Sequence, residues 1–290
     1  MIKINAIPLD YEPRKKILPK LPEFVSAGGY REPEMSEFES AFLCGALKKF
    51  RPKKILEVGV AGGATTAIIL QTLEDAGEPY EMYSIDASEK FYRDPTKLSG
   101  FMADFAKDNN LFTPPPSGLS GKHEFYRGKF LPQVIDEIGG DIDFVILDTM
   151  HIMPGEGLDF LAVLPYLKAG AVVVLHDVSL NQFEGFSNAH ATTVLFSSVT
   201  AEKFLNFVQG DANSKFTYPN IAAFQINEQT VKNIENVFLT MVLRWNYLPS
   251  QGELQLYLRH YKRHYPPELC KIFLEAIRMN LYNMVVASYV

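Results

Sequence analysis

Two short segments hold the side chains best suited to chemistry. The first contains Asp148 and His151, and the second contains His176 and Asp177. Each follows an apolar run typical of a buried strand, so the four side chains should meet at the carboxyl edge of a parallel sheet, where open α/β folds bind ligands. Carboxylate oxygens in such an array suit Mg²⁺. Asp148 and Asp177 are therefore candidate metal ligands, with His176 as a softer third ligand.

Each of these residues also has a plain structural explanation. Either aspartate could cap a helix, and either histidine could be a hydrogen-bonded residue of the core. For any one of them alone, that explanation would be preferred. The doubled pattern of acid and histidine at two neighbouring strand ends favours a functional site.

A glycine turn follows the first expected strand. The segment reads Glu57-Val58-Gly59-Val60-Ala61-Gly62-Gly63, and a helix should begin just after it. This layout suits a nucleotide-like ligand, but the glycine spacing differs from the Gly-x-Gly-x-x-Gly of dinucleotide-binding folds. A carboxylate at Glu57 would repel a diphosphate and favour a cationic ligand such as S-adenosylmethionine, which carries an ammonium and a sulfonium. The residues expected to bind this cofactor are Glu57, Gly59, Ala61, Gly62 and Gly63.

Asp86 ends the next expected strand. In a Rossmann-like sheet, the acid at this place hydrogen-bonds the ribose hydroxyls of an adenosine. Alone it could equally be a helix cap, but together with the glycine turn it predicts ribose binding. Asp148, at a neighbouring strand end, is expected to border the same cofactor.

Strands and helices alternate along most of the chain. Strands are expected at a segment ending in Glu57 and at 81–86, 124–126, 142–148, 171–177 and 221–226, with helices at 34–50, 65–76, 97–108, 132–137, 156–167 and 191–199. Continuously apolar strands that alternate with helices predict an α/β fold. We expect a Rossmann-like, doubly wound, mostly parallel sheet of seven strands.

Three regions are expected. Residues 1–33 contain five prolines and should form an arm or lid, 34–227 the Rossmann-like domain, and 228–290 a helical extension. Residues 109–121 should form a loop. The extension carries an aromatic and basic cluster, Trp245, Tyr247, Tyr257, Tyr261, His264 and Tyr265, which would either contact a substrate or pack against the main domain.

Composition narrows the class of protein. The net charge of −6 gives little attraction for nucleic acid, and no apolar run is long enough to cross a membrane. The two cysteines, Cys44 and Cys270, indicate buried thiols in a reducing compartment, and no signal peptide is recognisable. We therefore expect a cytoplasmic protein. Its oligomeric state is open, with a homo-oligomer as one option.

In their order along the chain, these motifs resemble the class I S-adenosylmethionine-dependent methyltransferases. The most similar branch contains the macrocin-type sugar O-methyltransferases, some of whose members carry a cephalosporin hydroxylase label. The resemblance covers about residues 29 to 226. That family commonly has Asp-Gly-x-His after the fourth strand and His-Asp or Glu-Asp at the end of the fifth. Here Thr149 and Met150 depart from the first pattern, and His176 stands where the clearest metal-binding members have glutamate.

The resemblance implies roles for three of these residues. Asp148 and Asp177 would bind Mg²⁺, and His151 would be the general base. An imidazole, with an ordinary pKa of about 6.5, can take the proton of a sugar hydroxyl, which is a poor nucleophile at neutral pH. If no metal binds, Asp148 would orient the ring of His151. The expected function is O-methylation of a sugar, glycan or other small molecule.

Two other functions remain open at this point. One is a scaffold module that keeps the cofactor fold without catalysis, which Met150 in the acidic motif would favour. The other, weaker, is an NAD-dependent oxidoreductase, because NAD would use the same acid at Asp86.

Overall fold

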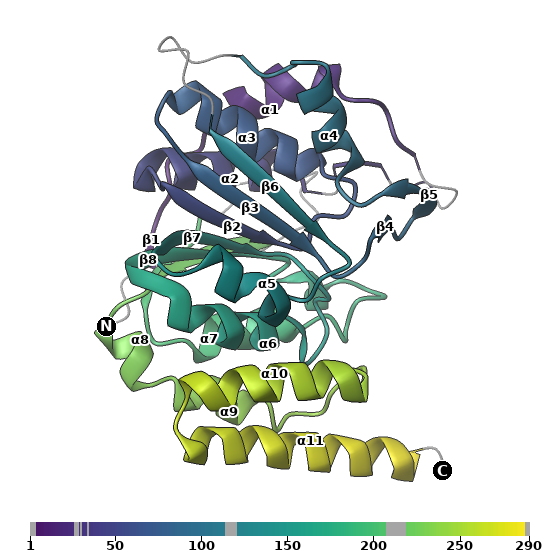
Figure 1. Cartoon of the computed structure of the whole chain (residues 1–290), viewed down its shortest axis with the longest axis vertical. Helices are drawn as coiled ribbons and strands as arrows, with labels where there is room; N and C mark the ends of the chain where they lie inside the picture. The colour runs from purple at the N-terminus through teal and green to yellow at the C-terminus, as the bar shows by residue number, and fades with distance from the viewer. Residues whose placement is uncertain are drawn as a thin grey trace.

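A twisted sheet of eight strands forms the centre of the chain (Figure 1). The computed structural model describes residues 4–25, 29, 31–33, 35–113, 121–206 and 219–287. The strand order is β1-β9-β10-β8-β7-β2-β3-β6. The strand bounds are β1 Ile4–Asn5, β2 Lys54–Val58, β3 Glu81–Asp86, β6 Lys122–Arg127, β7 Ile142–Leu147, β8 Leu167–His176, β9 Glu202–Phe204 and β10 Ile221–Gln225.

Five adjacent strands, from β6 at one edge through β3, β2 and β7 to β8, run parallel to one another. Strand β10 runs antiparallel to β8 and β9, and β1 adds an eighth strand at the edge. The expected Rossmann-like architecture is confirmed, since it accounts for seven of the strands. The two-residue β1 comes from the arm, where the sequence carries no strand pattern.

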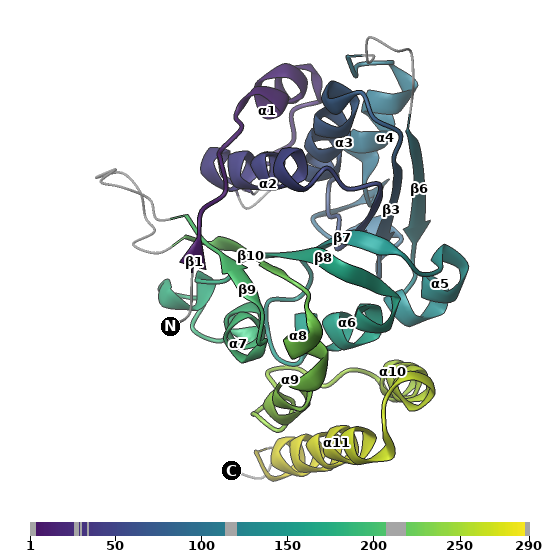
Figure 2. The same cartoon turned by 90° about the vertical axis from the view of Figure 1, so that its left-hand side faces the viewer.

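Helices cover both faces of the sheet (Figure 2). One face carries α2 and α3, and the other carries α5, α6 and α7. Their bounds are α2 Glu37–Phe50, α3 Ala64–Ala76, α5 Leu131–Ile138, α6 Gly155–Val163 and α7 Ala191–Ser198. Apolar side chains from both faces of the sheet are buried, as a doubly wound fold requires.

The arm is more regular than its prolines indicate. It forms a helix, α1 Glu12–Ile17, followed by a 3₁₀ turn at Leu18–Lys20. Pro13 stands in the first helical turn, where its missing N–H costs little, and Ile17 is fully buried in a cluster with residues of α3.

The helix expected over 97–108 begins later, as α4 Phe101–Asp108. Residues before it form a hairpin of β4 Lys90–Phe91 and β5 Asp94–Leu98. Ser99 explains the late start, because its hydroxyl donates to the carboxylate of Asp86 and to the carbonyl of Ala61. In the loop expected at 109–121, residues 114–120 lie outside the described residues.

The carboxy-terminal helices pack against the α6 side of the domain (Figure 1). They are α8 Glu228–Lys232, α9 Glu235–Thr240, α10 Gln251–His264 and α11 Pro267–Ala287. Trp245, Tyr257 and Tyr261 are buried in the main core, so they belong to packing and not to an open surface. Cys44 and Cys270 are buried free thiols, as expected. None of the helices in the described part of the chain is long and apolar enough to cross a membrane.

Candidate functional site

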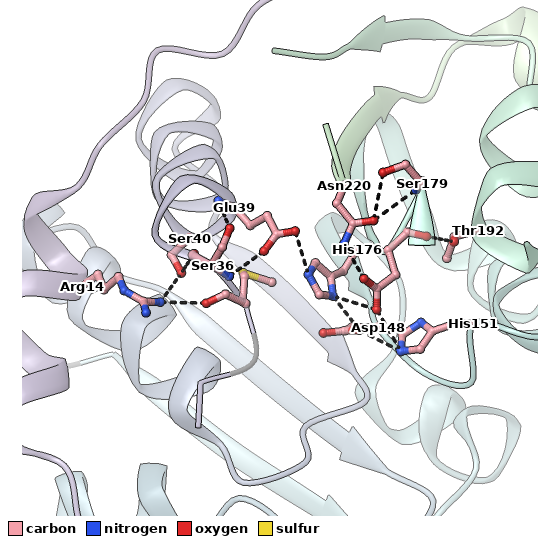
Figure 3. Close-up of polar contacts among 12 residues, drawn as sticks. Arg14, Ser36, Glu39, Ser40, Asp148, His151, His176, Ser179, Thr192 and Asn220 are labelled. Atoms are coloured by element: carbon pink, nitrogen blue, oxygen red, sulfur yellow. Dashed lines mark hydrogen bonds and ion pairs between the residues drawn. The ribbon is translucent and has the colours of Figure 1, made fainter. Parts of the chain in front are cut away.

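The structure brings the four acid and histidine residues of the sequence prediction into one cluster. Figure 3 labels three of them, Asp148, His151 and His176. Asp148 follows β7, His176 ends β8, Asp177 comes next, and His151 lies in the loop before α6. His151 Nε2 lies 3.2 Å from Asp177 Oδ2 and 3.7 Å from Asp148 Oδ1. His176 Nδ1 lies 3.2 Å from the same oxygen of Asp148 and 3.4 Å from Asp177 Oδ2.

The backbone at this cluster is held in an unfavourable conformation. His151 has φ +59° and Asp177 has φ +58°, which residues other than glycine rarely adopt. Such strain costs on the order of 1–3 kcal/mol for each residue and concentrates at functional sites. The surrounding chain holds both residues in place: Ala191 N donates to the carbonyl of His151 at 3.0 Å, and Thr192 Oγ1 donates to that of Asp177 at 2.7 Å.

Two buried glutamates, which the sequence analysis did not identify, complete the cluster. Glu39 reaches it from α2, with Oε1 3.6 Å from His176 Nε2. Glu156 reaches it from α6, with Oε1 3.3 Å from His151 Nδ1. The sequence gives only a local signal for Glu39, because Ser36 and Glu39 have the spacing of a helix capping box, which they also form.

Carboxylates surround both imidazoles and keep them protonated. Burial alone would lower the pKa of His151, but Glu156, Asp177 and Asp148 outweigh it and raise this pKa to about 9. Burial is likewise outweighed at His176, where Asp177, Asp148 and Glu39 raise the pKa well above its ordinary value. In the ligand-free cluster the carboxylates therefore favour the protonated form of both imidazoles.

A divalent cation fits part of this cluster. Asp148, His151 and Asp177 each offer one ligand atom, and these atoms lie within 4.8 Å of one another. The mixed carboxylate and imidazole donors suit a divalent transition metal as well as Mg²⁺. His176, whose raised pKa favours its protonated form, contacts the same carboxylates of Asp148 and Asp177 and in that form opposes the binding of a cation.

The glycine turn is closely packed from several sides. A Cβ atom on Gly59 would lie 1.8 Å from the carbonyl oxygen of Asp148, and one on Gly63 would lie 2.6 Å from Gly100 Cα. A Cβ on Gly62 would lie 2.9 Å from Cδ of Glu32, an acidic side chain of the arm. These short distances leave little room for a side chain at the three positions, which explains why they are glycines. They also show that Glu32 lies against the turn.

Glu57 lies beneath the glycine turn, in the core. Its side chain is 2% exposed, and its carboxyl group accepts hydrogen bonds from the hydroxyls of Thr66 and Ser84. Burial raises the pKa of Glu57 to about 8, although these hydrogen bonds oppose the shift. This raised pKa favours the uncharged form and weakens the argument that the charge of Glu57 selects a cationic ligand. A direct contact between Glu57 and a cofactor stays a prediction.

Asp86 lies beside the same turn, as the prediction of a ribose contact requires. Its Oδ2 accepts hydrogen bonds from the backbone N–H groups of Val60 and Ala61, at 3.2 and 3.1 Å, and from the hydroxyl of Ser99 at 2.7 Å. Oδ1 accepts from the backbone of Ser88. Asp86 thus joins the turn to the segment before α4, and its contact with ribose stays a prediction.

Comparison with known proteins identifies the central part of the chain. Residues 56–178 match a family model described as "Methyltransferase domain". This stretch is therefore similar to a methyltransferase domain, in line with the resemblance drawn from the sequence, and it contains the glycine turn and the acid and histidine cluster. Curated proteins gave no match to the sequence.

Solved structures give more distant similarities. They include the O-methyltransferase TomG from Streptomyces achromogenes in complex with SAM, at 17% identity, TM-score 0.46, and coverage of 67% of this chain and 83% of that one. An O-methyltransferase from Bacillus cereus in complex with SAH has 16% identity, TM-score 0.45, and coverage of 75% and 92%. The TDP-rhamnose 3'-O-methyltransferase CalS11 has 15% identity, TM-score 0.44, and coverage of 63% and 77%.

Proposed function

We propose that the methyltransferase domain of residues 56–178 transfers a methyl group from S-adenosylmethionine to a hydroxyl group of a sugar or other small molecule. The observation that carries this proposal is the position of His151 within the domain. Its Nε2 belongs to the cluster of acids at the carboxyl edge of the sheet, where α/β folds bind their ligands. An imidazole there is suited to removing a hydroxyl proton.

The reaction would be a direct displacement. The acceptor oxygen forms a bond to the methyl carbon while the bond from that carbon to sulfur breaks, so the sulfonium becomes a neutral thioether. The hydroxyl proton passes to Nε2 of His151. Because no covalent intermediate with the protein is needed, much of the acceleration should come from holding donor and acceptor in line.

The other members of the cluster would support this step. Asp148 and Asp177 stabilise the imidazolium that forms on His151, since both carboxylates lie near Nε2. Asp148 and Asp177 would hold a divalent cation such as Mg²⁺. His151, which completes the possible metal group, is kept for the proton in this proposal. When bound, that cation would lower the pKa of the acceptor hydroxyl.

Calorimetry tests the proposed function. We expect S-adenosylmethionine and S-adenosylhomocysteine to bind to the whole chain, and NADH not to bind. Titrations with and without Mg²⁺ report whether a cation contributes. Absence of binding by both adenosyl ligands would reject the methyltransferase proposal and favour a scaffold module, whereas tight binding of NADH would support an oxidoreductase.

Asp86→Ala should weaken donor binding. The substitution removes the carboxylate proposed to hold the ribose hydroxyls, and it also frees the N–H groups of Val60 and Ala61. Loss of such charge-assisted hydrogen bonds corresponds to about 1.5–3 kcal/mol. Calorimetry with S-adenosylhomocysteine measures the change. Asp94→Ala, at an exposed turn of the β4–β5 hairpin, is the matched control, and unchanged affinity in Asp86→Ala would show that the ribose lies elsewhere.

A further inference from the structure

Glu156 is the most completely buried acid in contact with the predicted general base. Its residue is 0% exposed, and it stands in the first turn of α6. A single oxygen, Oε1, accepts hydrogen bonds from the backbone N–H groups of Thr149 and His151, at 3.2 and 2.8 Å. The same oxygen lies 3.3 Å from His151 Nδ1, which is within ion-pair distance, although the geometry is not that of a hydrogen bond and Nδ1 has no hydrogen-bond partner among the described residues. One carboxylate oxygen therefore contacts both the loop that carries His151 and its ring.

These contacts fix which ring nitrogen faces the acids on the sheet edge. An imidazole can rotate about its bond to Cβ, and the two orientations related by a 180° flip occupy nearly the same space. With Nδ1 held toward Glu156 on α6, Nε2 is directed toward Asp177 and Asp148. A 180° flip about that bond would exchange Nδ1 with Cδ2 and Nε2 with Cε1, so that ring carbons would take the places of the nitrogens that now face Glu156 and Asp177.

A buried charge without a partner is costly, so the carboxylate needs a compensating group. Oε2 of Glu156 is buried and has no hydrogen-bond partner within the described parts of the chain. The compensation therefore comes through Oε1, from the two N–H groups and from the ring of His151. Glu156 also holds the loop at the residue with the unfavourable φ of +59°.

We propose that Glu156 is a positioning residue for the methyl-transfer reaction: it holds Nδ1 of His151 and thereby presents Nε2 to the acceptor hydroxyl. This inference rests on the proposed function, because it assumes that His151 is the base. In the sequence, Glu156 stands only at the start of an expected helix and has no predicted functional role. Its place in the cluster depends on how α6 packs beneath the loop.

Glu156→Gln separates positioning from simple support of the loop. The amide oxygen of glutamine can still accept from the N–H groups of Thr149 and His151, but the negative charge beside the ring is lost. The loss of the Glu156 charge also lowers the pKa of His151, so the comparison is made above pH 9, where the base is largely neutral in both proteins. There we expect kcat to fall by roughly 10²-fold, as small misplacements of catalytic groups do, while the Kd of S-adenosylhomocysteine and the Tm stay close to those of the unmodified protein. Turnover equal to that of the unmodified protein would show that Glu156 only supports the loop, and would overturn the inference.

Two further variants complete the comparison. Glu156→Asp keeps the charge but shortens the side chain, so it should also turn over slowly, and normal turnover would contradict a role that depends on reach. Glu74→Gln is the matched control, because Glu74 is a buried glutamate that bonds Tyr80 and lies outside the acid and histidine cluster. It should retain full turnover.

A spectroscopic measurement tests the same contact without turnover. In protein with ¹⁵N-labelled histidine, a long-range ¹H–¹⁵N spectrum should show Nδ1 of His151 protonated and slow to exchange with water. His151→Gln assigns the signal, and Glu156→Gln should speed its exchange. If exchange is equally fast in both proteins, the inference fails. This measurement requires no ligand, so its result is independent of the calorimetry. If the chain binds no S-adenosylmethionine, the proposed function is rejected, whatever the spectrum shows.

Discussion

His151→Gln is expected to slow methyl transfer by roughly 10²- to 10⁴-fold and to leave binding of S-adenosylhomocysteine nearly unchanged. Glutamine fills a similar space but cannot take up the hydroxyl proton. The donor is held by the glycine turn and Asp86 in our proposal, so its affinity should not depend on His151. Single-turnover rates with saturating donor, together with calorimetry, measure the two quantities separately.

His264→Gln is the matched control for this experiment. His264 is exposed on α10, where its ring contacts Tyr166, and it lies outside the acid and histidine cluster. It should keep the full rate. If His151→Gln also keeps the full rate, then His151 is not the base. A large loss of donor affinity in His151→Gln would instead show that the residue binds the cofactor.

The rate should depend strongly on pH. His151 must be neutral to accept a proton, and the acids around it raise its pKa to about 9 in the ligand-free protein. Well below that pH the neutral fraction rises about tenfold for each pH unit, so kcat/KM should increase roughly 50-fold between pH 7 and pH 9 and level off about one pH unit higher. The measurement requires EDTA, because a cation bound to Asp148 and Asp177 would lower the pKa of His151 by competing for the same carboxylates.

The variant His151→Gln supplies the control for the pH profile. Its residual rate should lack the rise toward pH 9, because the titrating base is gone. A profile in the unmodified protein that is flat from pH 7 to pH 9 in EDTA would mean that another group takes the proton. A midpoint near the ordinary histidine value of about 6.5 would mean that the carboxylates do not act on His151 as the structure indicates.

The parts of the fold and site that follow directly from strand endings could be predicted from the sequence. Asp148 and Asp177 each come directly after a continuously apolar strand, and parallel strands bring such ends to one edge. Their meeting with His151 and His176 therefore needed no knowledge of helix packing. The helix at 191–199 was also predicted correctly, although its β-branched residues fit a strand as well.

Residues that enter the cluster from helices could not be predicted in this way. Glu39 and Glu156 both lie in the first turn of a helix, and not at a strand end. An acid at that position ordinarily stabilises the helix end, so its residue type alone does not indicate a functional site. Only the packing of α2 and α6 on opposite faces of the sheet brings them to the histidines. The burial of Glu57, which raises its pKa, likewise depends on three-dimensional packing and could not be predicted from the sequence.

A crystal structure of the whole chain with S-adenosylhomocysteine tests the central claim most directly. We expect the ribose hydroxyls at the carboxylate of Asp86, the amino-acid part of the ligand against the glycine turn, and the thioether sulfur facing the side of the cluster that carries His151. A ligand bound away from Asp86, or a sulfur too far from His151 for an acceptor hydroxyl to lie between them, would contradict it.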